Sequence, residues 1–591
     1  MDEPLRSEHV MVVAIDFGTT YSGYAFSLGS EFESEPTKIS SNKPWIASQG
    51  LVSHKTPTCV LLKPDKSFYK FGYEAEDKYN EIAESQDDDH RKYYFFRRFK
   101  MILHTRPHLH RETTIEDETG KSLTAKTIFV HGLRFLKDHA LNTINSQGKA
   151  VDELDIHWVL TVPAIWSDGA KQFMREAALK AGIESNNLSI ALEPEAASVY
   201  CKFLPSHQLS ESSASQSMFK PGVKYMVVDL GGGTADITVH KVESGKKLCE
   251  IHGPSGGAWG GTKVDEAFMN FLNEIFGEKL MQKFKNECME DAIDLYREFE
   301  VRKRKVALDM SETPWMAIKI PVALFELYKE KHGCCLKEDI EKNEMYKDRI
   351  KCKADKLQID SKLVQSFFKK SLDDLAEHMR DIIGEMPVRG TDTFIIVGGC
   401  AESEIVRDTI KKKFSNMKIV IPFDAGLAVL KGAVIFGHYP MVVSSRVCRR
   451  TYGVAVSKIF VKGQYADDRM EKVGGREIVR NVFHKYIQLG APTEVGHAVT
   501  SLPLTAQRGE SQARIRIFSS TDKHPQYVTE KGCCYLGEII INLPQNEQSE
   551  QSREGQVEVK MKFGGTELAV EAIEKSSGKS YKSRFDFLSC S

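Results

Sequence analysis

The chain carries one short pattern twice: an apolar, β-branched run, then aspartate, then glycine and threonine. The copies cover residues 12–20 and 226–234, and their aspartates, Asp16 and Asp229, lie 229 − 16 = 213 residues apart. Each apolar run predicts a buried strand. The glycines after it predict a tight turn into a second strand, over residues 21–26 and 235–240. A unit repeated in this way predicts a duplicated fold with a cleft between its halves.

Composition limits the classes of protein to which such a fold could belong. The 591 residues are enough for about four domain-sized units. With 81 Lys+Arg against 82 Asp+Glu, the net charge of −1 argues against a nucleic-acid scaffold and against an acidic disordered tail. The hydrophobic fraction of 41% and the charged fraction of 28% are typical of globular proteins.

The N-terminus, the apolar runs and the cysteines indicate where such a chain resides. The N-terminus is polar and acidic, so we expect no signal peptide. No apolar run approaches the roughly 18 residues that span a bilayer. The twelve cysteines form no CxxC pair and no cluster with zinc spacing, which favours reduced thiols. We therefore expect a cytoplasmic protein, with the nucleus as the alternative, that is a monomer or weak oligomer and binds neither nucleic acid nor a membrane.

Helical and strand patterns divide the chain. Apolar stripes at helical spacing predict helices over residues 167–181, 262–276 and 360–383, and the last leads into a buried strand at 394–397. Ser167 is the expected N-cap of the first helix, and Thr262 with Asp265 resembles a capping box for the second. This alternation of strands and helices predicts an α/β domain.

The remainder has a different character. Short alternating runs with turns between them predict an antiparallel β-sandwich without a helical lid. The predicted units are thus an α/β domain over 1–437, a linker over 438–450 and the sandwich over 451–591. Polar stretches at 205–220 and 545–556 predict exposed loops.

The chemistry of the two turns points to phosphate. Glycines let the backbone approach an anion closely and present N–H groups to it, and threonine hydroxyls add donors. An aspartate at the strand end fits if it holds a hydrated Mg²⁺ ion. One such turn could equally be an ordinary hairpin. The pair, together with Gly398 and Gly399 after a third strand, favours a nucleotide site.

These segments resemble one known family. AIDFGTTYSGYAF and VVDLGGGTADIT are similar to the two phosphate loops of the seventy-kilodalton heat-shock protein family, within the actin and hexokinase ATPase superfamily. VPAIWSDGAKQFMREAALKAGI, LEPEAASVY and FIIVGGCAES resemble its connecting, glutamate-proline and adenosine motifs. YGVAV and the strands after it resemble its peptide-binding sandwich. RRFKMIL and GPSGGAWGGTKVDEAF indicate a divergent branch.

The resemblance implies a two-lobed, actin-like or hexokinase-like α/β ATPase domain, followed by the smaller sandwich. It implies ATP or ADP with Mg²⁺ as ligands, and protein or peptide clients or signalling partners. Asp16 and Asp229 are expected to hold Mg²⁺ through water, and Glu193, Asp236 and Thr234 to serve catalysis. The expected nucleotide-binding residues are Gly18, Thr19, Thr20, Tyr21, Gly231, Gly232, Gly233, Thr234, Gly260, Gly261, Glu300, Lys303, Arg304, Gly398, Gly399 and Asp424.

Some of these positions have a second interpretation, and others depart from the family. Glu300, Lys303 and Arg304 could form a solvated face of a charged helix. Glu76 stands where the family has a catalytic lysine, and a carboxylate cannot stabilise negative charge on a transferring phosphoryl group. Lys70 or Lys78 could substitute. The adenosine motif holds Cys400 and Glu402 where a small hydroxyl residue and a basic residue are usual.

Three functions are compatible with these observations. The first is a chaperone-like ATPase of the stress response, in which nucleotide shifts the sandwich between two states. The second is a nucleotide-dependent adaptor with little turnover, which Glu76 favours. The third, a small-molecule kinase of the same superfamily, leaves the sandwich without a purpose, as an actin-like filament would. The sandwich itself could be a peptide-binding domain or a docking module without a peptide cleft.

Overall fold

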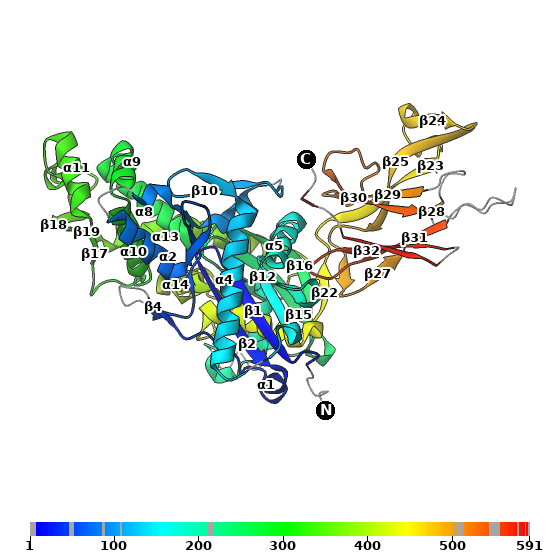
Figure 1. Ribbon diagram of the computed structural model, residues 1–591, viewed down its shortest axis with the longest axis horizontal. Coiled ribbons are helices and arrows are strands. Elements are labelled where there is room, and N and C mark those ends of the chain that lie inside the picture. Colours follow the sequence, from blue (N-terminus) through cyan, green and yellow to red (C-terminus); the bar gives the residue numbers. More distant parts are fainter. Residues whose placement is uncertain are drawn as a thin grey trace.

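The computed structural model describes residues 7–46, 52–84, 89–106, 109–149, 151–210, 218–500, 504–505, 512–542, 556–575, 578–584 and 587–588. A smaller part built of strands, coloured yellow to red in Figure 1, lies at one side of a larger α/β part. The predicted loop at 545–556 falls almost wholly outside the described residues, as do residues 211–217 of the predicted loop at 205–220.

The first lobe is built on a six-stranded sheet in which β1 lies at the centre. The strands β1 and β2 form an antiparallel hairpin, while β12 and β13 run parallel to β1. The apolar run predicted as a strand is fully buried in β1. The strands of this sheet are β1 (Met11–Phe17), β2 (Tyr21–Leu28), β3 (Ser40–Ser41), β6 (Thr56–Pro57), β12 (Ile156–Val162) and β13 (Leu188–Leu192).

The second lobe repeats this plan in a seven-stranded sheet. Here β14 and β15 form the antiparallel hairpin, and β20 and β21 continue the sheet in parallel. The strands are β14 (Lys224–Leu230), β15 (Ala235–Val242), β16 (Leu248–Gly257), β20 (Thr393–Val397), β21 (Lys418–Val420), β22 (Val443–Val447) and β26 (Pro492–Glu494). The duplication predicted from the repeated pattern is therefore present in the α/β part.

Two helices join the lobes through one apolar cluster. The helices α6 (Glu193–Phe203) and α15 (Ala428–His438) contribute to it most among the elements, and strands of both sheets, including β1, β12, β14 and β20, add further side chains. The helices cross in direct contact, because a Cβ at Gly432 would lie only 1.7 Å from the carbonyl oxygen of Ala196. The turns that follow β1 and β14 are thereby held on one common core.

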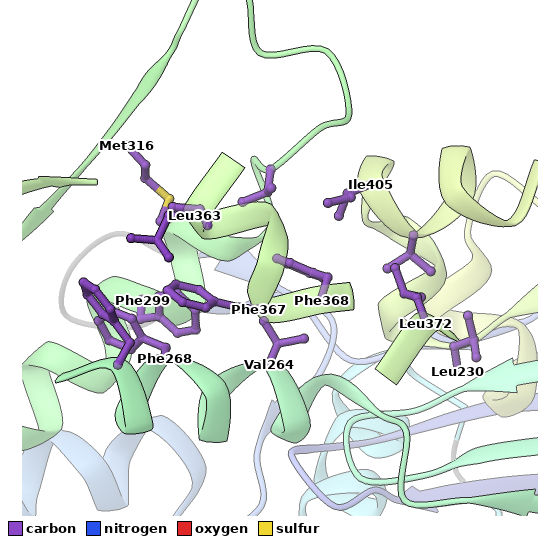
Figure 2. Packing of buried hydrophobic residues seen from close by; sticks show 14 of the residues in the cluster. Leu230, Val264, Phe268, Phe299, Met316, Leu363, Phe367, Phe368, Leu372 and Ile405 are labelled. Atoms are coloured by element: carbon purple, nitrogen blue, oxygen red, sulfur yellow. The ribbon is translucent and has the colours of Figure 1, made fainter. Parts of the chain in front are cut away.

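Each lobe has a further core of its own. In the first, α4 (Ala125–Ser146) and α5 (Asp168–Lys180) cover the sheet. In the second, α8 (Gly261–Phe276), α10 (Met289–Lys303) and α13 (Ser361–Gly384) pack together, as Figure 2 shows. The Phe268 and Phe299 rings stack there with centroids 3.9 Å apart. Stacked aromatic side chains of this kind bury large apolar areas.

The C-terminal strands form two antiparallel sheets whose buried side chains share one cluster. The first has the order β24-β25-β23-β29-β30, and the second the order β27-β31-β32-β33 with β28 beside β31. Val454 and Ile517 of the first sheet belong to the same cluster as Val559 and Val570 of the second. The strands are β23 (Thr451–Ile459), β24 (Met470–Val473), β25 (Arg476–Ile487), β27 (Ala498–Thr500), β28 (Leu504–Thr505), β29 (Gln512–Ser520), β30 (Cys533–Asn542), β31 (Gln556–Lys562), β32 (Ala569–Glu574) and β33 (Ser580–Arg584).

Most predicted elements are confirmed within one or two residues, and one cap is wrong. Ser167 caps α5 as predicted, since its Oγ accepts a hydrogen bond from the Ala170 N–H at 3.2 Å. The capping box predicted at Thr262 is not formed. Gly260 is the N-cap of α8, and the Asp265 carboxylate instead binds Lys303.

The segment predicted as a linker also carries regular structure. Within 438–450, the strand β22 pairs in parallel with β16 and antiparallel with β26. The chain therefore adds two strands to the sheet of the second lobe around the point where the C-terminal sheets begin. The division at 438–450 stays a prediction.

Candidate functional site

A cavity of about 640 Å³ lies between the two lobes, where both glycine turns meet. Its volume is in the usual range for sites that take small ligands, about 300–1,000 Å³. The cavity is lined by every residue predicted for the site except Asp236: Asp16, Gly18, Thr19, Thr20, Tyr21, Glu193, Asp229, Gly231, Gly232, Gly233, Thr234, Gly260, Gly261, Glu300, Lys303, Arg304, Gly398, Gly399 and Asp424. Segments far apart in the sequence are thus brought to one place.

The two turns touch each other across the cleft. A Cβ at Gly232 would lie 2.1 Å from Thr20 Oγ1, so a larger residue at this position would push the turns apart. The turn after β14 is also tied to α8, because the Thr262 N–H donates to the Gly232 carbonyl at 2.8 Å. The turn after β14 is therefore held on one side by the turn after β1 and on the other by α8.

Two lysines that were not among the predicted site residues reach Asp16 and Glu193, whose carboxylates form the acidic floor of the cavity. Lys55 Nζ lies 2.6 Å from Asp16 Oδ2, and Lys100 Nζ lies 3.0 Å from Glu193 Oε1. Both lysines line the cavity. Lys55 precedes β6, and Lys100 follows β9 (Tyr94–Arg97), so neither belongs to a glycine turn. Lys100 lies within RRFKMIL, which indicated only a divergent branch, and no motif includes Lys55.

These pairs set the protonation of the acidic groups. Burial disfavours the charge of Asp16, but Lys55 and Lys100 outweigh it and hold the pKa of Asp16 below its ordinary value. Burial also disfavours the charge of Lys55, yet Asp16 outweighs it and raises the lysine's pKa. Burial raises the pKa of Glu193, which Lys100 lowers only in part.

The other two acidic residues lie opposite each other on β14 and β15. Burial, together with Glu193, Asp236 and Asp16, raises the pKa of Asp229 well above its ordinary value. Burial and the charge of Glu193 raise the pKa of Asp236 to about 7. Asp236 does not line the cavity, and its Oδ2 accepts the Ala164 N–H at 2.5 Å instead. It supports the segment that follows β12.

The charged residues of α10 form a paired group at the cavity wall. Lys303 donates to Asp265 at 2.7 Å and to Glu300 at 2.5 Å. Arg304 pairs with Glu300 at 2.9 Å, and its guanidinium lies 5.4 Å from the ring centroid of Tyr21. These residues line the cavity rather than forming only a solvated face.

The turn after β20 lines the cavity beside the turn after β14. Gly398 has φ +89°, and a Cβ there would lie 2.4 Å from Asp229 Oδ1, so this position accommodates only glycine. Cys400 Sγ lies 3.2 Å from the Gly231 carbonyl, and burial raises the pKa of the thiol to about 11. Asp424 accepts from Tyr200 at 2.8 Å and Lys431 at 2.5 Å.

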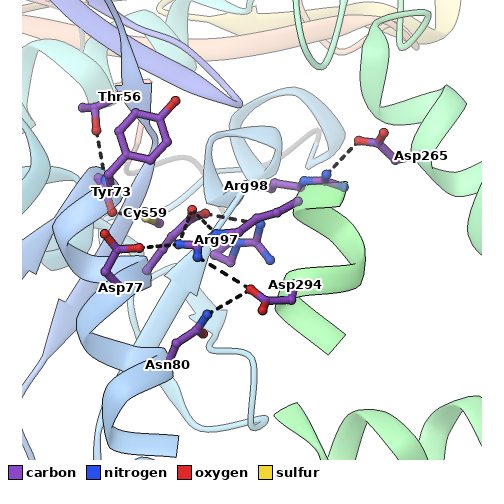
Figure 3. Close-up of polar contacts among 12 residues, drawn as sticks. Thr56, Cys59, Tyr73, Asp77, Asn80, Arg97, Arg98, Asp265 and Asp294 are labelled. Atoms are coloured by element: carbon purple, nitrogen blue, oxygen red, sulfur yellow. Dashed lines mark hydrogen bonds and ion pairs between the residues drawn. The ribbon is translucent and has the colours of Figure 1, made fainter. Parts of the chain in front are cut away.

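Glu76 lies outside this cavity, in a second one of about 380 Å³. Its carboxylate pairs with Arg297 of α10 at 3.0 Å and with Arg97 at 3.4 Å. Figure 3 shows the polar contacts at this place, with Asp77 and Asn80 of α2 (Gly72–Ala83), Arg97 of β9 and Asp294 of α10. Lys70 and Lys78 pair with glutamates at the surface and do not line the nucleotide-sized cavity, so neither takes the place of the family lysine there.

A magnesium ion held through water, as the resemblance implies, would need its water molecules to reach the carboxylate oxygens of Asp16. Both oxygens of Asp16 are engaged, Oδ2 by Lys55 and Oδ1 by the Thr161 hydroxyl at 3.0 Å. A divalent cation bound next to the Lys55 ammonium would be repelled by it. The side chains at Asp16 therefore fit a lysine ammonium and do not fit Mg²⁺.

Comparisons with known proteins agree with this geometry. A family model described as "Hsp70 protein" matches residues 98–439, more than half of the 591 residues. The chain is 32% identical over 643 residues to Heat shock 70 kDa protein 12B of Homo sapiens, covering 99% of this chain and 92% of the relative. It is 32% identical to Heat shock 70 kDa protein 12A of Homo sapiens and 33% identical to that of Mus musculus, over 99% and 98% of this chain and 92% of each relative.

These relatives confirm the divergent branch predicted from the sequence. Among the helices that the structure describes, none combines the length and apolar character needed to cross a bilayer. Family membership implies the actin-like ATPase fold, and the two similar α/β sheets around one cleft agree with it. The chain belongs to the Hsp70 family, on the branch of the heat shock 70 kDa proteins 12A and 12B.

Proposed function

We propose that this chain binds ATP and ADP in the cavity between its lobes and uses the bound nucleotide to control a protein-binding C-terminal module. One observation carries the proposal: residues from separate segments, each expected from its sequence motif to bind nucleotide, line one cavity of about 640 Å³. The two glycine turns would present backbone N–H groups to the phosphates. Glu300, Lys303 and Arg304 would face the nucleoside.

In this proposal, ATP hydrolysis is slow and depends on how the chain positions the attacking water and the phosphates. Glu193 and Thr234 line the cavity and would orient a water for in-line attack on the γ-phosphate. Asp236 would act indirectly, because its carboxylate accepts the Ala164 N–H and does not line the cavity. Lys55 and Lys100 would supply the positive charge that Glu76 cannot.

The junction offers a physical route from the cavity to the C-terminal sheets. Glu195 lies on α6 two residues after Glu193, and both its oxygens accept from Arg446 at 2.7 Å. Arg449 donates to the carbonyls of Ala164 and Trp166 at 2.6 and 2.7 Å, and the Ala164 N–H is bound by Asp236. A change in the position of Glu193 would therefore move Glu195, which holds Arg446. A change in the position of Asp236 would move the segment at Ala164, which holds Arg449.

The C-terminal sheets would form a β-sandwich that binds protein or peptide clients. Their shared apolar cluster supports a two-layered module, and the β30 edge strand exposes the Ile540 side chain by 44%. An exposed strand edge can accept an extended peptide through main-chain hydrogen bonds. A docking surface for a folded partner is the alternative use of the same module.

A single-turnover experiment tests the proposal. Excess full-length chain is mixed with radiolabelled ATP, and bound ATP and ADP are followed over time. We expect saturable binding and conversion to ADP that is slow but faster than in a Glu193→Ala variant, which lacks the carboxylate proposed to orient the water. Failure to bind ATP or ADP under any condition would rule out the nucleotide site.

The second candidate, a nucleotide-dependent adaptor with little turnover, is favoured by the position of Glu76. Its carboxylate is held by Arg97 and Arg297, away from the cavity that would contain the phosphates. Binding without conversion over hours in the same experiment would support this function. The search for partners would then turn to the C-terminal sheets.

A further inference from the structure

Lys55 occupies an unusual place in the cavity. Its side chain crosses β2 at Gly23, where a Cβ would lie 3.0 Å from Lys55 Cγ. Gly23 pairs directly with Asp16 across the β1–β2 hairpin. The missing side chain at Gly23 thus opens a path by which the Lys55 ammonium reaches Asp16 from outside the glycine turns.

The ammonium is both anchored and available. It has three N–H donors, and among the described residues its one hydrogen-bond partner is Asp16 Oδ2 at 2.6 Å, while the charges of Asp229 and Glu193 act on it from farther away. The side chain is 18% exposed and lines the cavity beside the two glycine turns. Lys100, by contrast, is 3% exposed and lies 4.9 Å from the Trp166 ring centroid. Lys55 is therefore the cation of the pair that is open to a ligand.

We propose that Lys55 supplies to the nucleotide phosphates the charge that a divalent cation would otherwise supply, so that this chain binds nucleotide without Mg²⁺. The proposal rests on the proposed function, since it assumes phosphates in this cavity. One ammonium donor stays on Asp16, and the other two reach phosphate oxygens. Asp16 then orients the lysine and does not bind a hydrated metal.

The structure gives two reasons why the lysine and the metal exclude each other. Lys55 and Thr161 engage both oxygens of Asp16, at 2.6 and 3.0 Å. A divalent ion at this carboxylate would also lie within a few ångströms of the ammonium, where like charges repel strongly in a buried site. Among the described residues, no group of three or more Asp, Glu, His or Cys side chains could hold a metal elsewhere.

The test measures binding, so it does not depend on turnover. The affinity of the full-length chain for ADP is measured by calorimetry in excess MgCl₂ and in excess EDTA. We expect the two dissociation constants to agree within about threefold. A loss of tenfold or more in EDTA would overturn the proposal, and this comparison needs no variant.

A substitution then assigns the effect to one residue. Lys55→Met removes the ammonium and frees Asp16, so affinity in EDTA should fall at least about tenfold and MgCl₂ should restore much of it. Unchanged affinity of Lys55→Met in EDTA would overturn the assignment. Lys70→Met is the matched control, because Lys70 pairs with Glu74 at the surface and should behave as the unmodified chain.

The outcomes also separate the two proposals. If the unmodified chain binds ADP only with MgCl₂, the nucleotide site stands and the role of Lys55 falls. If ADP binds under neither condition, the nucleotide site itself falls, and the role of Lys55 with it. A thermal melt of each variant confirms that a loss of binding does not reflect a loss of fold.

Discussion

At the scale of single residues, Glu76 stands at the position of a family motif but has a different role. The family places a lysine here, and this chain places a carboxylate that is 4% exposed. Arg97 and Arg297 satisfy it from two different elements. The residue therefore joins the first lobe to α10 of the second, while Lys55 and Lys100 bring the positive charge to the cavity.

Replacing Glu76 by alanine should destabilise the chain strongly. Two arginines with side chains 15% and 14% exposed would lose this carboxylate. Breaking a buried ion pair on one side costs about 3–5 kcal/mol. A thermal melt should show a clear fall in Tm for Glu76→Ala. Glu74→Ala, at a side chain 60% exposed, should change the Tm little, and equal effects would contradict the structural role of Glu76.

At the scale of elements, the glycine turns are where backbone geometry and function meet. The turn after β20 brings Gly398 against both Asp229 and the Leu230 carbonyl, so it braces the turn after β14. This contact joins the third glycine turn to the second. The helices behind the turns were predictable because their apolar stripes are local, as in α8 and α13.

Gly398→Ala should weaken nucleotide binding, and backbone strain at the positive φ angle alone should not account for the loss. The added Cβ would meet Asp229 Oδ1 at 2.4 Å and the Leu230 carbonyl at 2.5 Å. Gly390→Ala is a matched control, because Gly390 has φ +88° and no atom within 4 Å of the added Cβ. Each variant bears a backbone cost of about 1 kcal/mol. Calorimetry should show weaker ADP binding only for Gly398→Ala.

At the scale of the whole molecule, charged groups join the α/β part to the C-terminal sheets. Arg446 is buried and binds Glu195, and its guanidinium also donates to the Gly564 carbonyl. Tyr452 donates to Asp168 at 2.9 Å, and Arg175 pairs with Glu567. The two parts are therefore held by groups whose charge state matters.

The stability of this junction should depend on pH through Glu250 of β16, whose Oε1 accepts the N–H of Val447 in β22 at 2.9 Å. Burial and the charge of Glu195 raise the pKa of Glu250 from 4.5 to about 8. Between these values the folded chain binds more protons than the unfolded chain, so the free energy of unfolding falls as pH rises. Glu250→Gln should reduce the slope of Tm against pH between about 5 and 8, while Asp229 and Asp236, whose pKa values are also raised, maintain the remaining slope. An unchanged slope would contradict the assignment to this residue.

Truncation should reveal where the α/β part ends. A fragment of residues 1–450 keeps β22 and Arg446 and should bind ADP as the full chain does. A fragment of residues 1–440 loses both, which leaves the buried Glu195 without Arg446 and the edge of β16 unpaired. We expect a lower Tm for the shorter fragment, and equal melting of the two would place the boundary before β22.

Local patterns were enough to predict the duplicated strand-turn-strand units, their glycine turns and the helices, and the family resemblance supplied the other predicted residues that line the cavity. A glycine turn depends on its own backbone, and a helical stripe depends on spacing within a few turns, so both are visible in one segment. The contacts of Lys55, Lys100, Glu76 and Asp236 were not visible. They depend on which distant segments meet across the cleft: Lys55 reaches Asp16 past Gly23, and Glu76 meets an arginine 221 residues away. Only the packing of the two lobes on their common core decides which charges face the cavity and which neutralise each other outside it.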